Sequence, residues 1–350
     1  MMDGSTAAAP AHPRAGAGDH LPILDGWRAL SILLVIAAHW FPLDPLLSGG
    51  NAAAGAGGMA LFFTLSGFLI TQFLLKRPEP VPFLIRRVLR IVPLAWAAVL
   101  ILFFAAWWQG GATGDAAHLS ANLLFYGNLP PAKLFPGGAH LWSLAVEMHF
   151  YIGIALLVAV GGRRSLYLLP LLALAVTAAR IAAGETISIV TWHRLDEILA
   201  GATLALVYFG ALGERPQQWL GRVPFWLAAV VAIGVTWWVE SPLAYARPYG
   251  VALLVGVSLY HAPVWVERVL SSRPAAYIAK ISYALYVFHM MFQHTWLGSG
   301  DTLEKYAKRP LLVAATWGAA HLSTFYYEQR FIDLARRLTS VREAKPLRTY

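Results

Sequence analysis

The 350-residue chain is too apolar for a soluble globular protein. Apolar residues make up 58% of it and charged residues only 13%, whereas soluble chains average about 25% charged residues. So few charges would leave long apolar stretches facing water, which excludes a soluble globular enzyme. The chain has no cysteine, which excludes disulfides, thiolate nucleophiles and zinc–thiolate sites. Its net charge of +9 would suit nucleic-acid binding only if the basic residues formed one binding face.

Apolar segments long enough to cross a bilayer follow one another along nearly the whole chain. We expect about ten spans, at residues 21–42, 58–75, 88–108, 143–161, 166–183, 195–211, 223–239, 248–266, 281–297 and 310–330. Backbone polar groups in lipid need internal partners, and these runs are too long for barrel strands, so the spans should be helices. The sequence therefore predicts an all-α, polytopic membrane helix bundle. Residues 1–20 are predicted to be a disordered tail.

The basic residues are distributed unevenly about these spans. If the N-terminus is cytoplasmic, about three quarters of the Lys and Arg residues fall on the cytoplasmic side. This bias predicts that both termini are cytoplasmic, and it removes the argument for nucleic-acid binding because the charges flank a membrane. The long outer segment 109–142 is expected to form a re-entrant or lid element. The short loops favour a bacterial inner (plasma) membrane.

Ionisable residues within the spans are the candidates for chemistry, because burying them in a membrane is costly. Arg28 and His39 are about three helical turns apart, on one face of the first span. Glu147 is predicted at a similar depth to His39. A carboxylate beside an imidazole would hold the ring in one tautomer and support a general base. The alternatives are a buried structural pair or two side chains that never meet, since the sequence gives depth but not rotation.

Three arginines cluster at the cytoplasmic start of the third span. Arg86 and Arg90 are four residues apart on one helix face, and Arg87 flanks them. Guanidinium groups bind phosphate oxygens through paired hydrogen bonds, which suits a phosphate-bearing cofactor. A topology anchor or a contact with anionic lipid explains the cluster equally well. Ser66 lies among small residues. They either allow close helix packing or mark the path of a thin substrate chain. No metal site is expected.

Five segments of the chain occur together in a familiar order. They are residues 24–30 with His39, 62–70, 86–93, 142–151 and 282–289. Between residues 21 and 338 the chain resembles the acyltransferase 3 family of membrane-bound O-acyltransferases, which leaves 339–350 as a cytoplasmic C-terminal tail. The resemblance implies transfer of an acyl group, often acetyl, from cytosolic acyl-CoA to a hydroxyl of an extracytoplasmic carbohydrate or a macrolide. It implies no tightly bound cofactor.

The resemblance also assigns roles to individual residues. The catalytic residues are expected to be His39, Glu147 and Arg28, and the donor-binding residues Arg86, Arg87, Arg90 and Ser66. The acceptor-binding residues are expected to be Trp142, Tyr151, Tyr286 and His289. Glu328 fits the family pattern poorly, because Gln329 and Arg330 follow it where many relatives have a proline two residues after the glutamate.

Direct transfer is favoured over an acyl-enzyme, because the chain has no cysteine. The expected partners are acyl-CoA, a carbohydrate or lipid-linked glycan acceptor, the lipid bilayer and polysaccharide-assembly proteins. Two other classes remain open. A transporter or flippase would use His39, Glu147 and His289 as a proton relay or substrate site, and a non-catalytic scaffold would serve polysaccharide assembly. Release of CoA by the purified protein would separate the enzyme from both.

Overall fold

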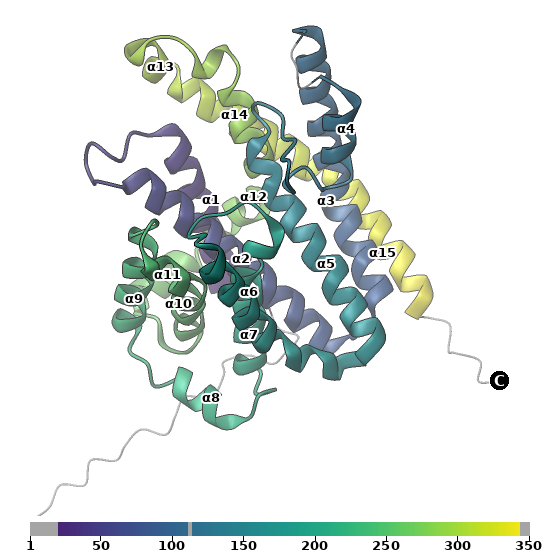
Figure 1. Cartoon of the computed structure of the whole chain (residues 1–350), viewed down its shortest axis with the longest axis vertical. Helices are drawn as coiled ribbons and strands as arrows, with labels where there is room; N and C mark the ends of the chain where they lie inside the picture. The colour runs from purple at the N-terminus through teal and green to yellow at the C-terminus, as the bar shows by residue number, and fades with distance from the viewer. Residues whose placement is uncertain (1–19, 111–113, 344–350) are drawn as a thin grey trace, which may run out of the picture.

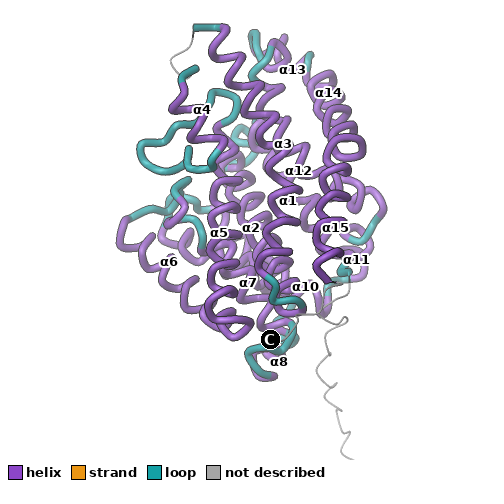
Figure 2. Tube along the Cα trace, turned by 90° about the vertical axis from the view of Figure 1, so that its right-hand side faces the viewer, coloured by secondary structure: helices purple, strands orange, loops and turns teal. Residues whose placement is uncertain are grey.

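The computed structural model describes residues 20–110 and 114–343, and over these ranges the chain is helical with no strand (Figures 1 and 2). Figure 2 shows the long helices running side by side along one direction, with α13 at one end of the bundle and α8 at the other. The all-α helix bundle predicted from the sequence is therefore confirmed. Residues 1–19 of the predicted tail at 1–20, and residues 344–350 of the predicted C-terminal tail, lie outside the described residues.

The helices follow the order of the predicted spans. The longer ones are α1 (Pro22–Trp40), α2 (Gly50–Lys76), α3 (Pro80–Trp108), α5 (Trp142–Gly161), α6 (Leu169–Ala183), α7 (Asp196–Tyr208), α9 (Phe225–Trp237), α10 (Arg247–His261), α12 (Arg273–Gln293), α14 (Arg309–Leu322) and α15 (Gln329–Glu343). The short ones are α4 (Ala116–Leu123), α8 (Glu214–Leu220), α11 (Val264–Leu270) and α13 (Thr302–Ala307). A short 3₁₀ turn, η1 (Ala139–Leu141), leads directly into α5.

The long apolar helices make the chain an integral, multi-pass membrane protein. Six described helical segments are long and apolar enough to cross a membrane, or seven if the bent pair α8 and α9 counts as one span. This count is lower than the expected ten or so, because two predicted spans fall within the single segment Ala139–Ala183, and because α7 and α14 have only 13 and 14 residues against the about 20 that a full crossing needs. Large apolar side chains project outward from the bundle, as a lipid environment requires; they include Phe104, Trp107, Leu156, Leu171 and Val230.

Helix α2 lies at the centre of the packing, between α1 and α7. A Cβ atom on Gly67 would overlap the carbonyl oxygen of Ile198, and one on Gly201 would overlap that of Thr64. The two glycines therefore allow α2 and α7 to pack backbone to backbone. On α1, the Ser31 hydroxyl donates to the Gly58 carbonyl at 2.8 Å, and this fixes α1 against α2.

The last long helix is continuous but changes its winding. Helix α14 passes through a π-helical segment, Ser323–Glu328, into α15, which packs against α3. The hydroxyls of Ser323 and Thr324 donate to the Glu328 carboxylate at 3.0 and 3.2 Å. Helix α15 thus covers one side of α3. The predicted domain end at residue 338 falls within α15.

Candidate active site

The predicted arginine cluster lines a cavity at one end of the bundle. Arg86, Arg87 and Arg90 border a space of about 250 Å³, which is completed by Phe73, Phe83, Ile332, Ala335 and Arg336. The Arg86 guanidinium lies 5.7 Å from the ring centre of Phe73, and that of Arg87 lies 5.9 Å from Phe83. Aromatic faces hold guanidinium groups in place, and Arg86 Nε also donates to the Thr339 hydroxyl at 3.0 Å. The cavity therefore offers several positive charges on a semi-apolar wall.

Glu147 lies buried on the same side as these arginines. The hydroxyls of Ser66 and Tyr151 both donate to its Oε1 atom, that of Tyr151 at 2.6 Å. The Arg87 guanidinium lies 6.0 Å from the ring centre of Tyr151, and the charges of Arg87 and Arg90 act on the Glu147 carboxylate. Glu147, Ser66 and Tyr151 thus form one polar cluster next to the arginine cavity.

His39, in the last turn of α1, borders a second and larger cavity, the outer cavity. This outer cavity has a volume of about 410 Å³, and its polar lining consists of His39, His140, Trp142, Arg194, Arg247 and Tyr286. The Nδ1 atom of His39 lies 2.8 Å from the Val35 carbonyl oxygen. Because a carbonyl can only accept, Nδ1 carries the hydrogen, and the neutral ring presents a lone pair at Nε2. A side chain in this state can accept a proton.

Two further histidines pack behind His39. The ring centres of His39 and His289 are 5.1 Å apart, and those of His289 and His140 are 4.9 Å apart. His289 is fully buried and its Nδ1–H donates to the Tyr286 carbonyl at 2.6 Å. The Ser143 hydroxyl donates to the Tyr286 hydroxyl at 2.7 Å. His289 therefore backs the His39 ring, whereas Tyr286 and Trp142 reach the outer cavity.

The predicted contact between Glu147 and His39 is not formed in the described part of the chain. Glu147 bonds to Ser66 and Tyr151, while His39 bonds to Val35 and lies against His289. The reason is the packing of the helices: α1 contacts α2 and α12, whereas α5 contacts α3. Tyr151, expected with the acceptor-binding residues, likewise lies on the arginine side.

A narrow cavity lies between the two larger ones. It has a volume of about 20 Å³, and its lining is Arg28, Ser31, Ile32, Val35, Met59, Phe62, Ser282 and Tyr286. It shares Val35, Met59 and Tyr286 with the outer cavity. At its other end, Arg28 interacts electrostatically with Arg90, Arg87 and Glu147. Residues of α1 from Arg28 to Val35 therefore line the narrow cavity, and Val35 and His39 line the outer cavity, whereas the arginine cavity shares no lining residue with either.

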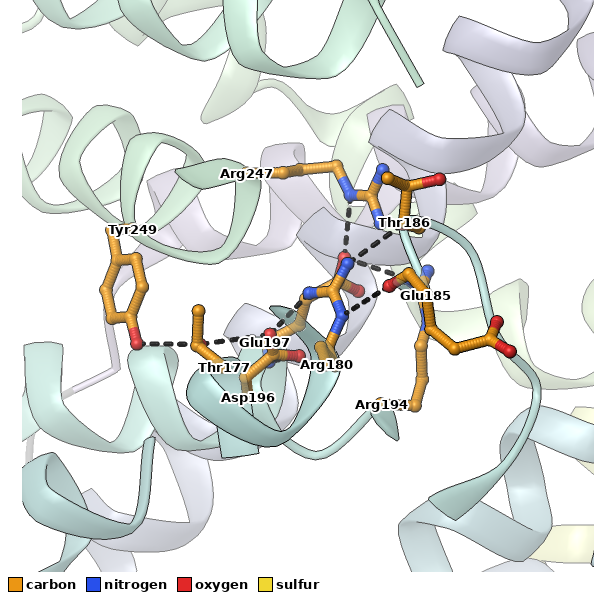
Figure 3. A network of polar contacts seen from close by, with 9 residues as sticks. All are labelled: Thr177, Arg180, Glu185, Thr186, Arg194, Asp196, Glu197, Arg247 and Tyr249. Carbon is orange, nitrogen blue, oxygen red and sulfur yellow. Dashed lines mark hydrogen bonds and ion pairs between the residues drawn. The ribbon is translucent and has the colours of Figure 1, made fainter. Parts of the chain in front are cut away.

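A buried ionic network beside the outer cavity was not predicted from the sequence, which gave Arg180, Arg194 and Arg247 no functional role. The structure instead places them around the carboxylates of Asp196 and Glu197 (Figure 3). The available signal was the position of these five charges at the ends of apolar spans, where ionisable groups are costly.

The site thus consists of two larger cavities in a polytopic helix bundle, one lined by arginines and one with a histidine at its edge. The sequence model of the acyltransferase 3 family, described as an acyltransferase domain, matches residues 21–323. The chain belongs to the acyltransferase 3 family, and it is a membrane O-acyltransferase.

Two relatives illustrate the family. Nodulation protein 10 of Rhizobium leguminosarum bv. viciae is 25% identical over 82% of this chain and 86% of its own length. Peptidoglycan O-acetyltransferase OatA of Listeria monocytogenes is 24% identical over 77% of this chain. The match covers only 49% of the Listeria protein, so the chain spans about half the length of that relative. No solved structure matches the chain significantly.

Proposed function

We propose that the chain transfers an acetyl group from acetyl-CoA, bound at the arginine cavity, to a hydroxyl of a carbohydrate that enters the outer cavity. The observation that carries this proposal is the pair of larger cavities, one lined by arginines and one bordered by His39, with the narrow cavity at Arg28 adjoining the outer cavity. The name of the Listeria relative, a peptidoglycan O-acetyltransferase, supports both acetyl and a carbohydrate acceptor. Bacterial relatives support a location in the bacterial inner membrane.

On the donor side, Arg86, Arg87 and Arg90 bind the CoA phosphates. Charge-assisted bonds from guanidinium to phosphate are strong and directional, and the cavity supplies them at the predicted cytoplasmic face. The Glu147 carboxylate balances part of this positive charge and accepts hydrogen bonds from Ser66 and Tyr151. Glu147 is therefore a positioning residue of the donor side in this proposal, in place of a direct partner of His39.

At the outer cavity, His39 acts as the general base. Its Nε2 lone pair takes the proton of the acceptor hydroxyl while the hydroxyl oxygen attacks the thioester carbonyl carbon. The resulting tetrahedral intermediate breaks its carbon–sulfur bond, and the CoA thiolate takes the proton back from His39. The products are the acetyl ester and CoA. The bond from His39 Nδ1 to Val35 keeps the ring in the tautomer that this step requires.

The test is glycan mass spectrometry of cells that lack the gene, complemented with the intact chain or with His39→Gln. The proposal predicts that deletion removes an acetyl mass from an envelope carbohydrate, that the intact chain restores it, and that His39→Gln at equal membrane abundance does not. Restoration by His39→Gln would contradict the assignment of the base. An unchanged glycan mass in the deletion strain would contradict the carbohydrate acceptor.

A further inference from the structure

The ionic network at the outer cavity contains more positive than negative charge. Arg180 pairs with Asp196, and Glu197 Oε1 lies 2.8 Å from Arg247 Nε and 3.2 Å from Arg194 Nη1. All five side chains are at least nine-tenths buried. Three guanidinium groups therefore face two carboxylates, which leaves one positive charge without a balancing carboxylate in the network. Figure 3 shows the carboxylate of Glu185 pointing away from the three guanidinium groups.

The three arginines differ in how well their N–H groups are used. Arg180 donates to Asp196 and to the carbonyls of Glu185 and Thr186 at 3.3 and 2.9 Å. By contrast, Arg194 Nε and Arg247 Nη1 are buried and have no hydrogen-bond partner within the described part of the chain, and Arg194 Nη1 is held by the Glu197 carboxylate as an ion pair at 3.2 Å. These two residues also line the outer cavity, whereas Arg180 does not. The unpaired donors, themselves buried, thus belong to the two arginines whose side chains line this cavity.

The geometry favours a bound anion over further packing. A buried N–H group without a partner costs free energy, and an excess buried charge adds to that cost. The Arg194 guanidinium lies beside the rings of Trp142 and Phe63, at 5.5 and 5.8 Å from their centres, and these contacts restrict its position. A neutral sugar hydroxyl could accept these hydrogen bonds, but only an anionic group also balances the charge.

We infer that Arg194 and Arg247 form a subsite for a carboxylate or phosphate group on the acceptor. The acceptor class is then an acidic carbohydrate, such as a uronic acid or a sugar phosphate, with the anionic group at the arginines and the reacting hydroxyl at His39. The inference rests on the proposed function for the presence of an acceptor in this cavity. The subsite determines specificity, and it takes no part in proton transfer.

Binding without any donor tests the subsite separately from acyl transfer. The purified full chain in detergent is titrated with methyl glucuronide, glucose 6-phosphate and methyl glucoside, and binding is followed by tryptophan fluorescence, to which Trp142 beside Arg194 contributes. The carboxylate or the phosphate sugar should bind about tenfold or more tightly than the neutral sugar, because hydrogen bonds to charged groups are the strong ones. Comparison of the two acidic sugars distinguishes the carboxylate from the phosphate.

The variants are Arg194→Gln and, as a matched control in the same network, Arg180→Lys. Arg194→Gln should reduce this preference to near unity, whereas Arg180→Lys, which is outside the cavity lining, should keep it. Equal binding of acidic and neutral sugars, no binding of either acidic sugar, or an unchanged preference in Arg194→Gln would overturn the inference. Loss of the preference in both variants would also overturn it, because the effect would then be structural. The failure of acyl transfer alone would leave these results unaffected.

Discussion

Arg86 and Arg90 are proposed to bind the phosphates of the donor, and their replacement tests this directly. The double variant Arg86→Gln/Arg90→Gln should raise the KM for acetyl-CoA by about tenfold or more, since each lost charge-assisted bond weakens binding. Steady-state CoA release measures it. The double variant Arg163→Gln/Arg164→Gln removes two exposed charges from the same predicted face and serves as the control. An unchanged KM, or the same rise in the control, would assign the cluster to topology.

A variant of Glu147 distinguishes the predicted pairing of Glu147 with His39 from the observed bonds of Glu147 to Ser66 and Tyr151. Glu147→Gln keeps an acceptor oxygen for Ser66 and Tyr151 but removes the negative charge that faces Arg87. We expect the KM for acetyl-CoA to change while the midpoint of the pH profile of kcat stays where it is in the intact chain. A shifted midpoint with an unchanged KM would show that Glu147 acts on the base His39.

For single residues, the sequence predicts which side chains line cavities better than it predicts which side chains contact one another. The face shared by Arg28 and His39 follows from helical spacing within one span, and the structure confirms that cavities follow it. The partners of Glu147 and the network around Glu197 depend on the rotation and the neighbours of different helices. Hydropathy and spacing carry no information about either of these.

The crossing of α2 and α7 depends on two glycines. Gly67→Ala should destabilise the protein by about 1–3 kcal/mol, because the new Cβ overlaps the backbone of Ile198 and forces the helices apart. Thermal unfolding in detergent measures the effect. Gly153→Ala on α5 is the control, since its Cβ would meet nothing within 4 Å and Ala favours a helix. Equal unfolding temperatures for the two variants would be inconsistent with this packing.

The sequence predicts that the elements are helices, but it does not predict the length of each helix. Long apolar runs specify helices because a membrane leaves no other way to satisfy the backbone. The short helices α7 and α9 deviate from the expected length. At the start of α7, Asp196 and Glu197 form ion pairs with arginines from other segments, so the region there is polar protein interior and not lipid. The sequence shows the charges but not the neighbours that neutralise them.

The predicted orientation of the whole molecule rests on the positions of the basic residues. The chain contains no cysteine, so single cysteines can be introduced without altering a background. Leu46→Cys, at an exposed site between α1 and α2, should react with an impermeant maleimide in intact cells (spheroplasts for a bacterial host), and Arg163→Cys should react only after the membrane is opened. Gel-shift labelling reads both. The reverse pattern would invert the proposed sides of donor and acceptor.

The central claim is that donor and acceptor meet from opposite sides of the membrane. The purified chain is reconstituted in liposomes that contain carbohydrate acceptor from the cell envelope, and acetyl-CoA labelled in the acetyl group is added outside only. The account predicts labelled carbohydrate inside the vesicles, formed by molecules whose arginine cavity faces outward, and none with His39→Gln. Product that forms only when acetyl-CoA and acceptor share one compartment would contradict it.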